Sequence, residues 1–189
     1  MLLAHDRHIL RALAAQVAEL AALPIQEEKR RLWRRLNARQ PDRPMVMIDQ
    51  VCWHEMAVGD ELKLVCTDKE CRGYELALRR VLFQWHHFPV DMVVEPFIRV
   101  AKAIRNTGFG IGVKEQTAVT DPQNTVVGHH YDNQFQTDED IARIRTPQIS
   151  HDQVETDRRL TLAHELFDGL LEVRASGADP YLSLWDPIS

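Results

Sequence analysis

Residues 91–96 read DMVVEP, a short run in which apolar Met92–Val94 is flanked by carboxylates. A continuous apolar run of this length, bounded by turn-forming residues, is typical of a strand that is buried on both faces of a sheet. Similar short runs occupy residues 45–48, 62–66 and 181–185. The sequence therefore predicts short buried strands at these four positions.

Long amphipathic stretches separate these runs. Apolar residues recur at helical spacing over residues 8–22, 67–88 and 153–175, and Pro24 marks the start of another helix. Short apolar strands that alternate with amphipathic helices favour an α/β fold with a parallel sheet. In such sheets ligand sites form at the carboxyl ends of the strands, which is where Glu95 stands.

The region around residues 110–135 has a different texture. Residues 117–119 and 125–127 flank DPQN, a turn sequence, and together they predict a β-hairpin. The run GFGIG at residues 108–112 has the glycine spacing of a phosphate-binding turn. Such a turn leads into a helix, whereas a hairpin follows here, so a flexible turn is the better interpretation.

Composition excludes several classes of protein. The chain has 189 residues, of which 44% are hydrophobic and 27% charged, with a net charge of −5. These values are ordinary for a globular protein and exclude collagen-like, coiled-coil and disordered chains. The net charge argues against a dedicated nucleic-acid or anionic-membrane surface. The basic stretch Lys29–Arg43 is interpreted as a solvated helical face whose arginines pair with neighbouring acids.

The cysteines and the N-terminus bear on the cellular compartment. Cys52, Cys66 and Cys71 contain no C-x-x-C pair, so a disulfide framework is not expected. The first residues carry charge where a signal peptide would need its apolar run, and no uncharged stretch has the length of a membrane span. We expect a cytoplasmic protein.

The first candidate site follows the run at 45–48. Trp53 could stack on a flat ligand, and the His54–Glu55 pair could move a proton. The alternative is a loop that is anchored by one tryptophan and carries two solvated polar groups.

A second candidate is Glu95. A carboxylate at the end of an apolar strand is expected to be partly buried, and burial would raise its pKa and suit it to acid or base chemistry. The alternative is a structural carboxylate that pairs with an arginine.

A third candidate is the run HHYD at residues 129–132. Adjacent histidines on an extended chain face opposite ways, so only one of them points at a given site. Together with His54, Glu95 or His151, one of them could contribute to a zinc or iron site. No metal-ligand spacing supports such a site, and a hydrogen-bonded histidine is the preferred interpretation.

A series of short segments carries a resemblance to a known family. The series consists of LWxxLN (32–37), PxRPMV (41–46), WHEM (53–56), CR (71–72), ExxLRR (75–80), QWxHxPxD (84–91), VVEP (93–96) and TGFG (107–110). It resembles the N-terminal half of uncharacterised bacterial proteins related to uroporphyrinogen decarboxylase. The same superfamily includes corrinoid-dependent methyltransferases.

The resemblance implies a partial (β/α)8 barrel of the TIM type. Residues 41–189 would form its N-terminal half, with a hairpin insertion around 110–135, after an N-terminal helical segment at 1–40. A complete barrel usually takes about 250 residues, so we expect either a fragment or a half-barrel that covers its open edges by association.

The chain also departs from the family that it resembles in two respects. In the decarboxylases an arginine-rich loop after the first strand holds the porphyrin carboxylates, whereas residues 49–55 contain no arginine. Porphyrinogen decarboxylation is therefore not expected. The methyltransferases hold zinc with a His-x-Cys motif and a later cysteine, so zinc or corrinoid would require a C-terminal half that this chain does not contain.

The leading hypothesis is that the chain supplies part of a pocket for a small or tetrapyrrole-derived ligand at the carboxyl ends of its strands. A complete barrel would be a lyase (decarboxylase) or a methyltransferase, and the chain alone is expected to be inactive. The alternative is a non-catalytic binding or assembly module that forms a homo-oligomer or pairs with a second chain. The proposed catalytic residues are His54 and Glu95, and the proposed ligand-binding residues are Trp53, Glu55, His129, Tyr131, Asp132 and Trp185.

Overall fold

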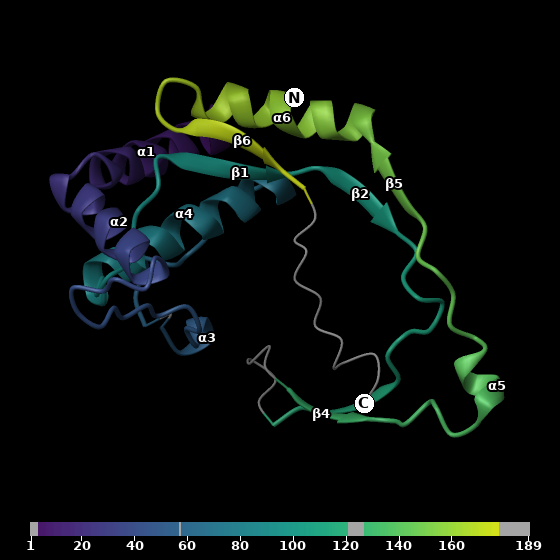
Figure 1. Cartoon of the computed structure of the whole chain (residues 1–189). Helices are drawn as coiled ribbons and strands as arrows, with labels where there is room; N and C mark the ends of the chain where they lie inside the picture. The colour runs from purple at the N-terminus through teal and green to yellow at the C-terminus, as the bar shows by residue number, and fades with distance from the viewer. Residues whose placement is uncertain (1–3, 57, 121–126, 178–189) are drawn as a thin grey trace. The chain divides into compact units, whose positions relative to one another are not determined.

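The structure, a computed structural model, describes residues 4–56, 58–120 and 127–177 (Figure 1). Helices dominate the first half of the chain, and short strands dominate the second. In chain order the elements are α1 (Ala4–Ala21), α2 (Pro24–Asn37), α3 (Trp53–Met56), α4 (Lys69–His87), β1 (Phe97–Ala101), β2 (Ala103–Asn106), β3 (Glu115–Ala118), β4 (Gly128–Tyr131), α5 (Asp138–Ile141), β5 (Ile149–Asp152), α6 (Gln153–Phe167) and β6 (Glu172–Ser176).

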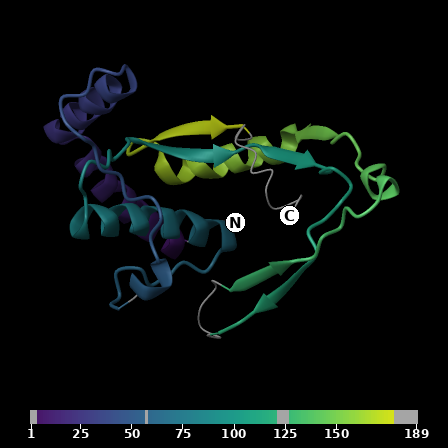
Figure 2. The same ribbon diagram turned by 60° about the horizontal axis from the view of Figure 1, so that its bottom comes forward.

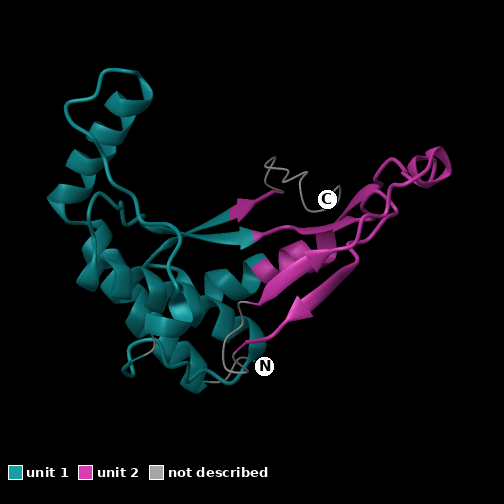
Figure 3. Ribbon diagram, turned by 90° about the horizontal axis from the view of Figure 1, so that it is seen from below, with its two compact units in different colours: residues 1–100, 160–174 teal, residues 101–159, 175–189 magenta. Residues whose placement is uncertain are grey.

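The chain divides into two compact units (Figure 3). Unit 1 comprises residues 1–100 and 160–174, and unit 2 comprises residues 101–159 and 175–189. The domain boundary expected at residue 40 stays a prediction. No single helix among the described residues is long and apolar enough to cross a membrane, although α1 and α2, bent by 64° at the break between them, pass that test as a pair.

The core of unit 1 forms between helices whose apolar residues recur at helical spacing. In α1 the buried side chains include Leu10, Leu13, Ala14 and Val17, which lie on one face of the helix. This face packs with α4 and with the C-terminal part of α6 in a single apolar cluster. At its centre Phe167 is fully buried and contacts Tyr74 edge to face, with 5.2 Å between ring centroids.

Strands β1 and β6 pair with each other and point the same way in both views (Figures 1 and 2). Ile98 and Val100 of β1 are buried in the cluster, and the intervening residues of the strand are exposed or half-buried. This alternation is the pattern of a strand with one buried face. Since α6 lies between β1 and β6 in sequence, the helix belongs to the connection that joins the two strands.

The prediction of a partial (β/α)8 barrel is wrong. The described residues form only two-stranded sheets, with the pairs β1–β6, β2–β5 and β3–β4. Residues 45–48, 62–66 and 91–94 are not strands, and 181–185 lies outside the described residues. Val46 and Met47, expected to be buried, are 51% and 56% exposed.

Side chains of α2 occupy the place that a neighbouring strand would take beside residues 91–95. The Val94 N–H donates to Gln26 Oε1 at 2.9 Å, and Arg30 donates to the Val94 carbonyl at 3.2 Å. Trp33 Nε1 donates to the Asp91 carbonyl at 2.8 Å. Buried backbone groups need a partner, and α2 supplies it. This is the physical reason why the apolar run at 91–94 does not become a strand of a parallel sheet.

The loop before α4 is fixed by two fully buried carboxylates. Asp6 of α1 accepts hydrogen bonds from the backbone N–H groups of Thr67 and Asp68. Glu75 of α4 accepts from the N–H groups of Val65 and Cys66. The Glu75 carboxylate therefore takes the place of a strand partner for Val65 and Cys66, at the end of the run expected to be a strand.

Unit 2 contains two antiparallel strand pairs. In β2–β5, Ala103 lies opposite Asp152 and Asn106 opposite Ile149. In β3–β4, Glu115 lies opposite Tyr131, within the region in which the sequence predicts a hairpin. Thr156 is the only buried residue among the residues of this unit that the structure describes.

Candidate functional site

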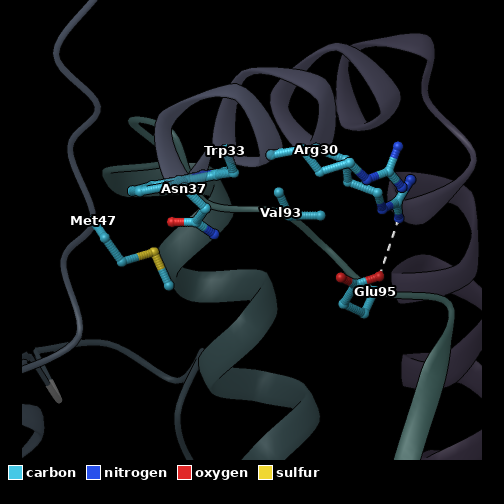
Figure 4. Close-up of a pocket in the computed structure, with 7 residues that line it drawn as sticks. Arg30, Trp33, Asn37, Met47, Val93 and Glu95 are labelled. Carbon is cyan, nitrogen blue, oxygen red and sulfur yellow. Dashed lines mark hydrogen bonds and ion pairs between the residues drawn. The ribbon is translucent and has the colours of Figure 1, made fainter. Parts of the chain in front are cut away.

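A pocket of about 520 Å³ lies between α2 and the segment around residues 93–95 (Figure 4). We call it the α2 pocket. It combines apolar walls with guanidinium, amide and carboxylate groups. Its lining residues are Arg30, Trp33, Arg34, Asn37, Met47, Val93 and Glu95.

The α2 helix places its share of the lining by simple periodicity. Arg30, Trp33, Arg34 and Asn37 are spaced i, i+3, i+4 and i+7, so they follow one face of the helix. The helix begins with Pro24 at its N-terminus and ends with basic residues, the order that the helix dipole favours. Gln26, Lys29 and Leu32 form its buried side.

The charges in the α2 pocket are partly compensated. Arg30 Nη2 lies 3.2 Å from Glu95 Oε2, and its Nη1 lies 3.5 Å from Glu27. Arg34 Nη1 lies 3.2 Å from the same Glu27 carboxylate, and the Arg34 side chain is 70% exposed. Because the Arg34 side chain is largely exposed and among the described residues pairs with Glu27 alone, its guanidinium is accessible to a bound anion.

Glu95 lies in this pocket in a setting that differs from the one expected. Its side chain is 43% exposed and paired with Arg30, so it is not the desolvated carboxylate that the sequence suggested. These contacts match the alternative interpretation of a carboxylate paired with an arginine. In Figure 4 the Glu95 carboxylate and the Arg30 guanidinium face each other at one end of the pocket.

Met47 reaches the opposite side of the pocket because its segment is attached to Asp91. Arg43 donates to both carboxylate oxygens of Asp91, at 2.8 and 2.5 Å, and the Val46 N–H donates to Asp91 Oδ2 at 2.8 Å. The Arg43 guanidinium lowers the pKa of Asp91 to about 2, against a smaller opposing effect of burial. The carboxylate is therefore ionised at all physiological pH values, and the segment stays attached.

Lys29 lies on the buried side of α2 and is 8% exposed. Its ammonium group lies 4.7 Å from the centroid of the Trp85 ring, a cation–π contact. Burial lowers the pKa of Lys29, while nearby Asp91 opposes this shift. Lys29 is not among the residues that line the α2 pocket.

The structure gives the candidates at 53–55 a packing role. Trp53 contacts Phe83 edge to face at 6.1 Å between centroids, and the Arg80 guanidinium lies 4.8 Å from the Trp53 ring. His54 Nε2 lies 3.4 Å from Glu55 Oε1. The contacts of Trp53 attach α3 to α4, the His54–Glu55 contact lies within α3, and none of the three residues lines the α2 pocket with Glu95.

The candidates in unit 2 lie on and beside β4. His129 and Tyr131 stack with their rings 5.8 Å apart, and His129 Nδ1 lies 2.8 Å from Glu115 Oε2. Asp132 accepts a long hydrogen bond of 3.5 Å from Gln116. These are contacts within one exposed strand pair. The proposed ligand-binding residue Trp185 lies outside the described residues.

Within residues 4–56, 58–120 and 127–177, no group of three His, Cys, Asp or Glu side chains is placed to hold a metal ion. Two of the three cysteines are buried, and Cys52 is exposed. Cys66 and Cys71 are buried, and burial raises the pKa of each thiol to about 12. Such thiols are inert at neutral pH.

The sequence does not single out the pocket face of α2. Arg30 and Arg34 fall in the stretch that predicts a solvated basic helix face, and Trp33 and Asn37 stand out only through the family resemblance. Their i, i+3, i+4 and i+7 spacing was the signal that could have singled out one face. The spacing does not predict where Met47 and Val93 lie, because their positions depend on the Arg43–Asp91 pair.

Comparison of the chain with protein-family models, with curated proteins and with solved structures gives no match. The resemblance to proteins related to uroporphyrinogen decarboxylase therefore stays a proposal.

Proposed function

We propose that the chain binds a small molecule with a flat apolar part and at least one carboxylate in the α2 pocket. The observation that carries this proposal is the convergence of Arg30, Arg34 and Asn37 with the apolar surfaces of Trp33 and Met47 in one cavity of about 520 Å³. Cavities of roughly 300–1,000 Å³ with apolar walls and a few polar groups are typical of small-molecule sites.

The chemistry of the lining favours a carboxylate. A guanidinium presents a planar pair of donors that fits the two oxygens of a carboxylate. Arg34 is the residue that offers this pair, because Arg30 is already bonded to Val94 and Glu95. The Asn37 amide adds a donor and an acceptor. The indole ring of Trp33 provides a flat apolar surface for a ring system.

A carboxylated ligand is of the class that the family resemblance implies, although residues 49–55 lack the arginines of the family's ligand loop. In the decarboxylases that the chain resembles, arginines hold the carboxylates of a tetrapyrrole. In our proposal the arginines come from α2, and the catalytic roles suggested for His54 and Glu95 remain untested proposals. No reaction is assigned to the pocket.

Replacing Arg34 tests the proposal. We expect Arg34→Gln to weaken binding of benzene-1,3,5-tricarboxylate about tenfold, because one charge-assisted hydrogen bond is lost. The measurement is isothermal titration calorimetry at constant ionic strength. The Arg34 side chain is mostly exposed and, within residues 4–56, 58–120 and 127–177, is bonded only to Glu27, so its replacement leaves the core intact.

The matched control is Arg31→Gln. Arg31 lies on the same helix, and its replacement removes the same charge. Its side chain, however, pairs with Asp42 and does not line the pocket. Its affinity for the probe should stay within about twofold of the unchanged protein. Equal weakening by both variants, or no binding to the unchanged protein, would contradict the proposal.

A second function is favoured by one observation in unit 2. Large apolar side chains that a folded unit leaves exposed to solvent favour association with another molecule. Thr156 is the only buried residue of this unit within the described residues, so the unit has no apolar core of its own there. Its large exposed apolar side chains are Phe109, Val113, Val119, Ile141, Ile144, Ile149 and Val154. We therefore propose, as the second candidate, that unit 2 joins a second copy of the chain.

Self-association is tested by mass against concentration. Sedimentation equilibrium should give a mass that rises from one copy to two, and Ile149→Glu should raise the dissociation constant at least about tenfold. Val58→Glu is the control, because Val58 is an exposed apolar residue of unit 1. A mass of one copy at every concentration would exclude this second function.

A further inference from the structure

A second cavity, of about 310 Å³, lies within unit 2. We call it the Gly108 pocket. The turn after β2 forms one side of it, and the segment between α5 and β5 forms the other. Its lining residues are Thr107, Gly108, Gly110, Arg145, Thr146 and Gln148, none of which is acidic.

The two sides are joined by backbone hydrogen bonds. The Thr107 N–H donates to the Gln148 carbonyl at 3.1 Å, and the Arg145 N–H donates to the Phe109 carbonyl at 2.8 Å. The Gln148 N–H in turn donates to Thr107 Oγ1 at 2.9 Å. The Thr107–Gln148 backbone bond continues the β2–β5 pairing beyond Asn106, and the three bonds together join the two sides of the pocket.

The glycines of the turn are required by its conformation. Gly108 and Gly110 have φ angles of 65° and 81°, values that side chains disfavour. A Cβ atom on Gly110 would lie 3.3 Å from both Cγ and Cδ of Arg145. The absence of a side chain at Gly110 therefore lets the Arg145 stem lie against the turn, with its charged group at the pocket.

The side chains that line the pocket offer hydrogen-bond donors that nothing nearby uses. Within the part of the chain that the structure describes, the Arg145 guanidinium, the Thr146 hydroxyl and the Gln148 amide have no hydrogen-bond or ion-pair partner. Arg143, two residues earlier, is by contrast paired with Asp140 at 3.0 Å. One permanent positive charge with surrounding neutral donors and no carboxylate is complementary to an oxyanion.

We propose that the Gly108 pocket binds a phosphate group, either as free phosphate or as part of a small phosphate monoester. The glycine-rich turn, which the sequence alone assigned to flexibility because no helix follows it, is thereby given a role that does not need a helix N-terminus. Arg145 pairs with two phosphate oxygens, and Thr146 and Gln148 donate to the others. This site is independent of the α2 pocket, since every residue that forms it belongs to unit 2.

The test is an NMR titration of the full chain, observed through its backbone amide signals. Inorganic phosphate, added at constant ionic strength against chloride, should shift the signals of Gly108, Gly110 and Thr146 and should reach saturation. Arg145→Gln should weaken this binding at least about tenfold. Arg105→Gln is the matched control: it removes the same charge from unit 2 but from a residue outside the pocket lining, and it should leave the affinity within about twofold.

The glycine pair gives a second, independent comparison. Gly110→Ala should weaken phosphate binding as Arg145→Gln does, because the added Cβ displaces the Arg145 stem. Gly112→Ala should bind normally, since nothing lies within 4 Å of a Cβ at that position. Phenyl phosphate in place of inorganic phosphate separates the two sources: tighter binding identifies a monoester site, and weaker binding a site for the free ion.

Several results would overturn the proposal. These are shifts that do not saturate, shifts that persist in Arg145→Gln, and equal weakening by Arg105→Gln and Arg145→Gln. The last of these would show general attraction of anions to the surface instead of a site. Arg34→Gln should have no effect on phosphate binding. Failure of the phosphate proposal can therefore be distinguished from failure of the ligand proposal for the α2 pocket.

Discussion

Replacement of Glu75 by alanine is expected to lower the free energy of unfolding by about 3–5 kcal/mol, the largest effect of any single change considered. Glu75 is fully buried and accepts hydrogen bonds from the N–H groups of Val65 and Cys66 at 3.0 and 2.8 Å. Arg79 Nε donates to the same carboxylate at 2.8 Å. Removing the carboxylate leaves buried donors without an acceptor, and it releases the loop that covers α4.

Urea denaturation of matched variants measures this effect. Glu19→Ala is the control, because Glu19 is an exposed residue in the last turn of α1, and its replacement should change the unfolding free energy by less than about 0.5 kcal/mol. Glu75→Gln keeps an acceptor in place and should lie between the two. If Glu75→Ala is as stable as Glu19→Ala, the carboxylate does not hold the loop.

The second large effect concerns Asp91 and depends on pH. Arg43 and the Val46 N–H hold the pKa of Asp91 at about 2 in the folded chain, whereas an unfolded aspartate titrates near about 3.9. Because the folded pKa is the lower one, the contribution to stability is fully present above about pH 5 and is lost as pH falls towards 2. Its size is on the order of 2 kcal/mol.

Asp91→Asn should remove this dependence. At pH 7 the variant is expected to be less stable by about 2 kcal/mol, and between pH 5 and pH 2 the difference from the unchanged protein should shrink. Asp6 and Glu75 also have lowered pKa values, through backbone hydrogen bonds that outweigh burial, and therefore add slope of the same sign. They add it to both proteins, so the difference isolates Asp91.

Asp42→Asn serves as the control for net charge. Asp42 pairs with Arg31 and Arg35 on an exposed part of the surface, so its replacement should cost less than about 1 kcal/mol. A stability difference between Asp91→Asn and the unchanged protein that stays constant with pH would contradict the assignment. Asp91→Asn should also weaken ligand binding in the α2 pocket, because Met47 loses its attachment.

The helices could be predicted from the sequence because their determinants are local. The apolar residues of α1 recur every three or four positions, and the structure buries that face. The end of a helix is less certain. Thr67 and Glu70 have the spacing of a capping box, which predicts Thr67 as the cap, but Asp68 caps α4 by accepting from the N–H groups of Glu70 and Cys71. Thr67 is bonded instead to Asp6, which is distant in sequence.

The expected strands failed for the opposite reason. A strand exists only where another strand supplies hydrogen bonds, and an apolar run such as 91–94 does not contain its partner. Here the partner is a helix, since Gln26, Arg30 and Trp33 bond to the backbone around Val94. The barrel that the resemblance implies is wrong for the same reason, because residues 45–48, 62–66 and 91–94 do not form the strands that it requires.

The sequence by itself determined the long helices α1, α2 and α4 of unit 1, whose hydrogen bonds join residues four apart and whose burial follows a fixed period. The tertiary structure alone decided the role of the charged residues. Glu75 and Asp91 look like ordinary surface acids in the sequence, and Arg30 like one of many solvated arginines. Their burial and their partners depend on donors from segments far along the chain, and that distance is the reason why no local pattern contains them.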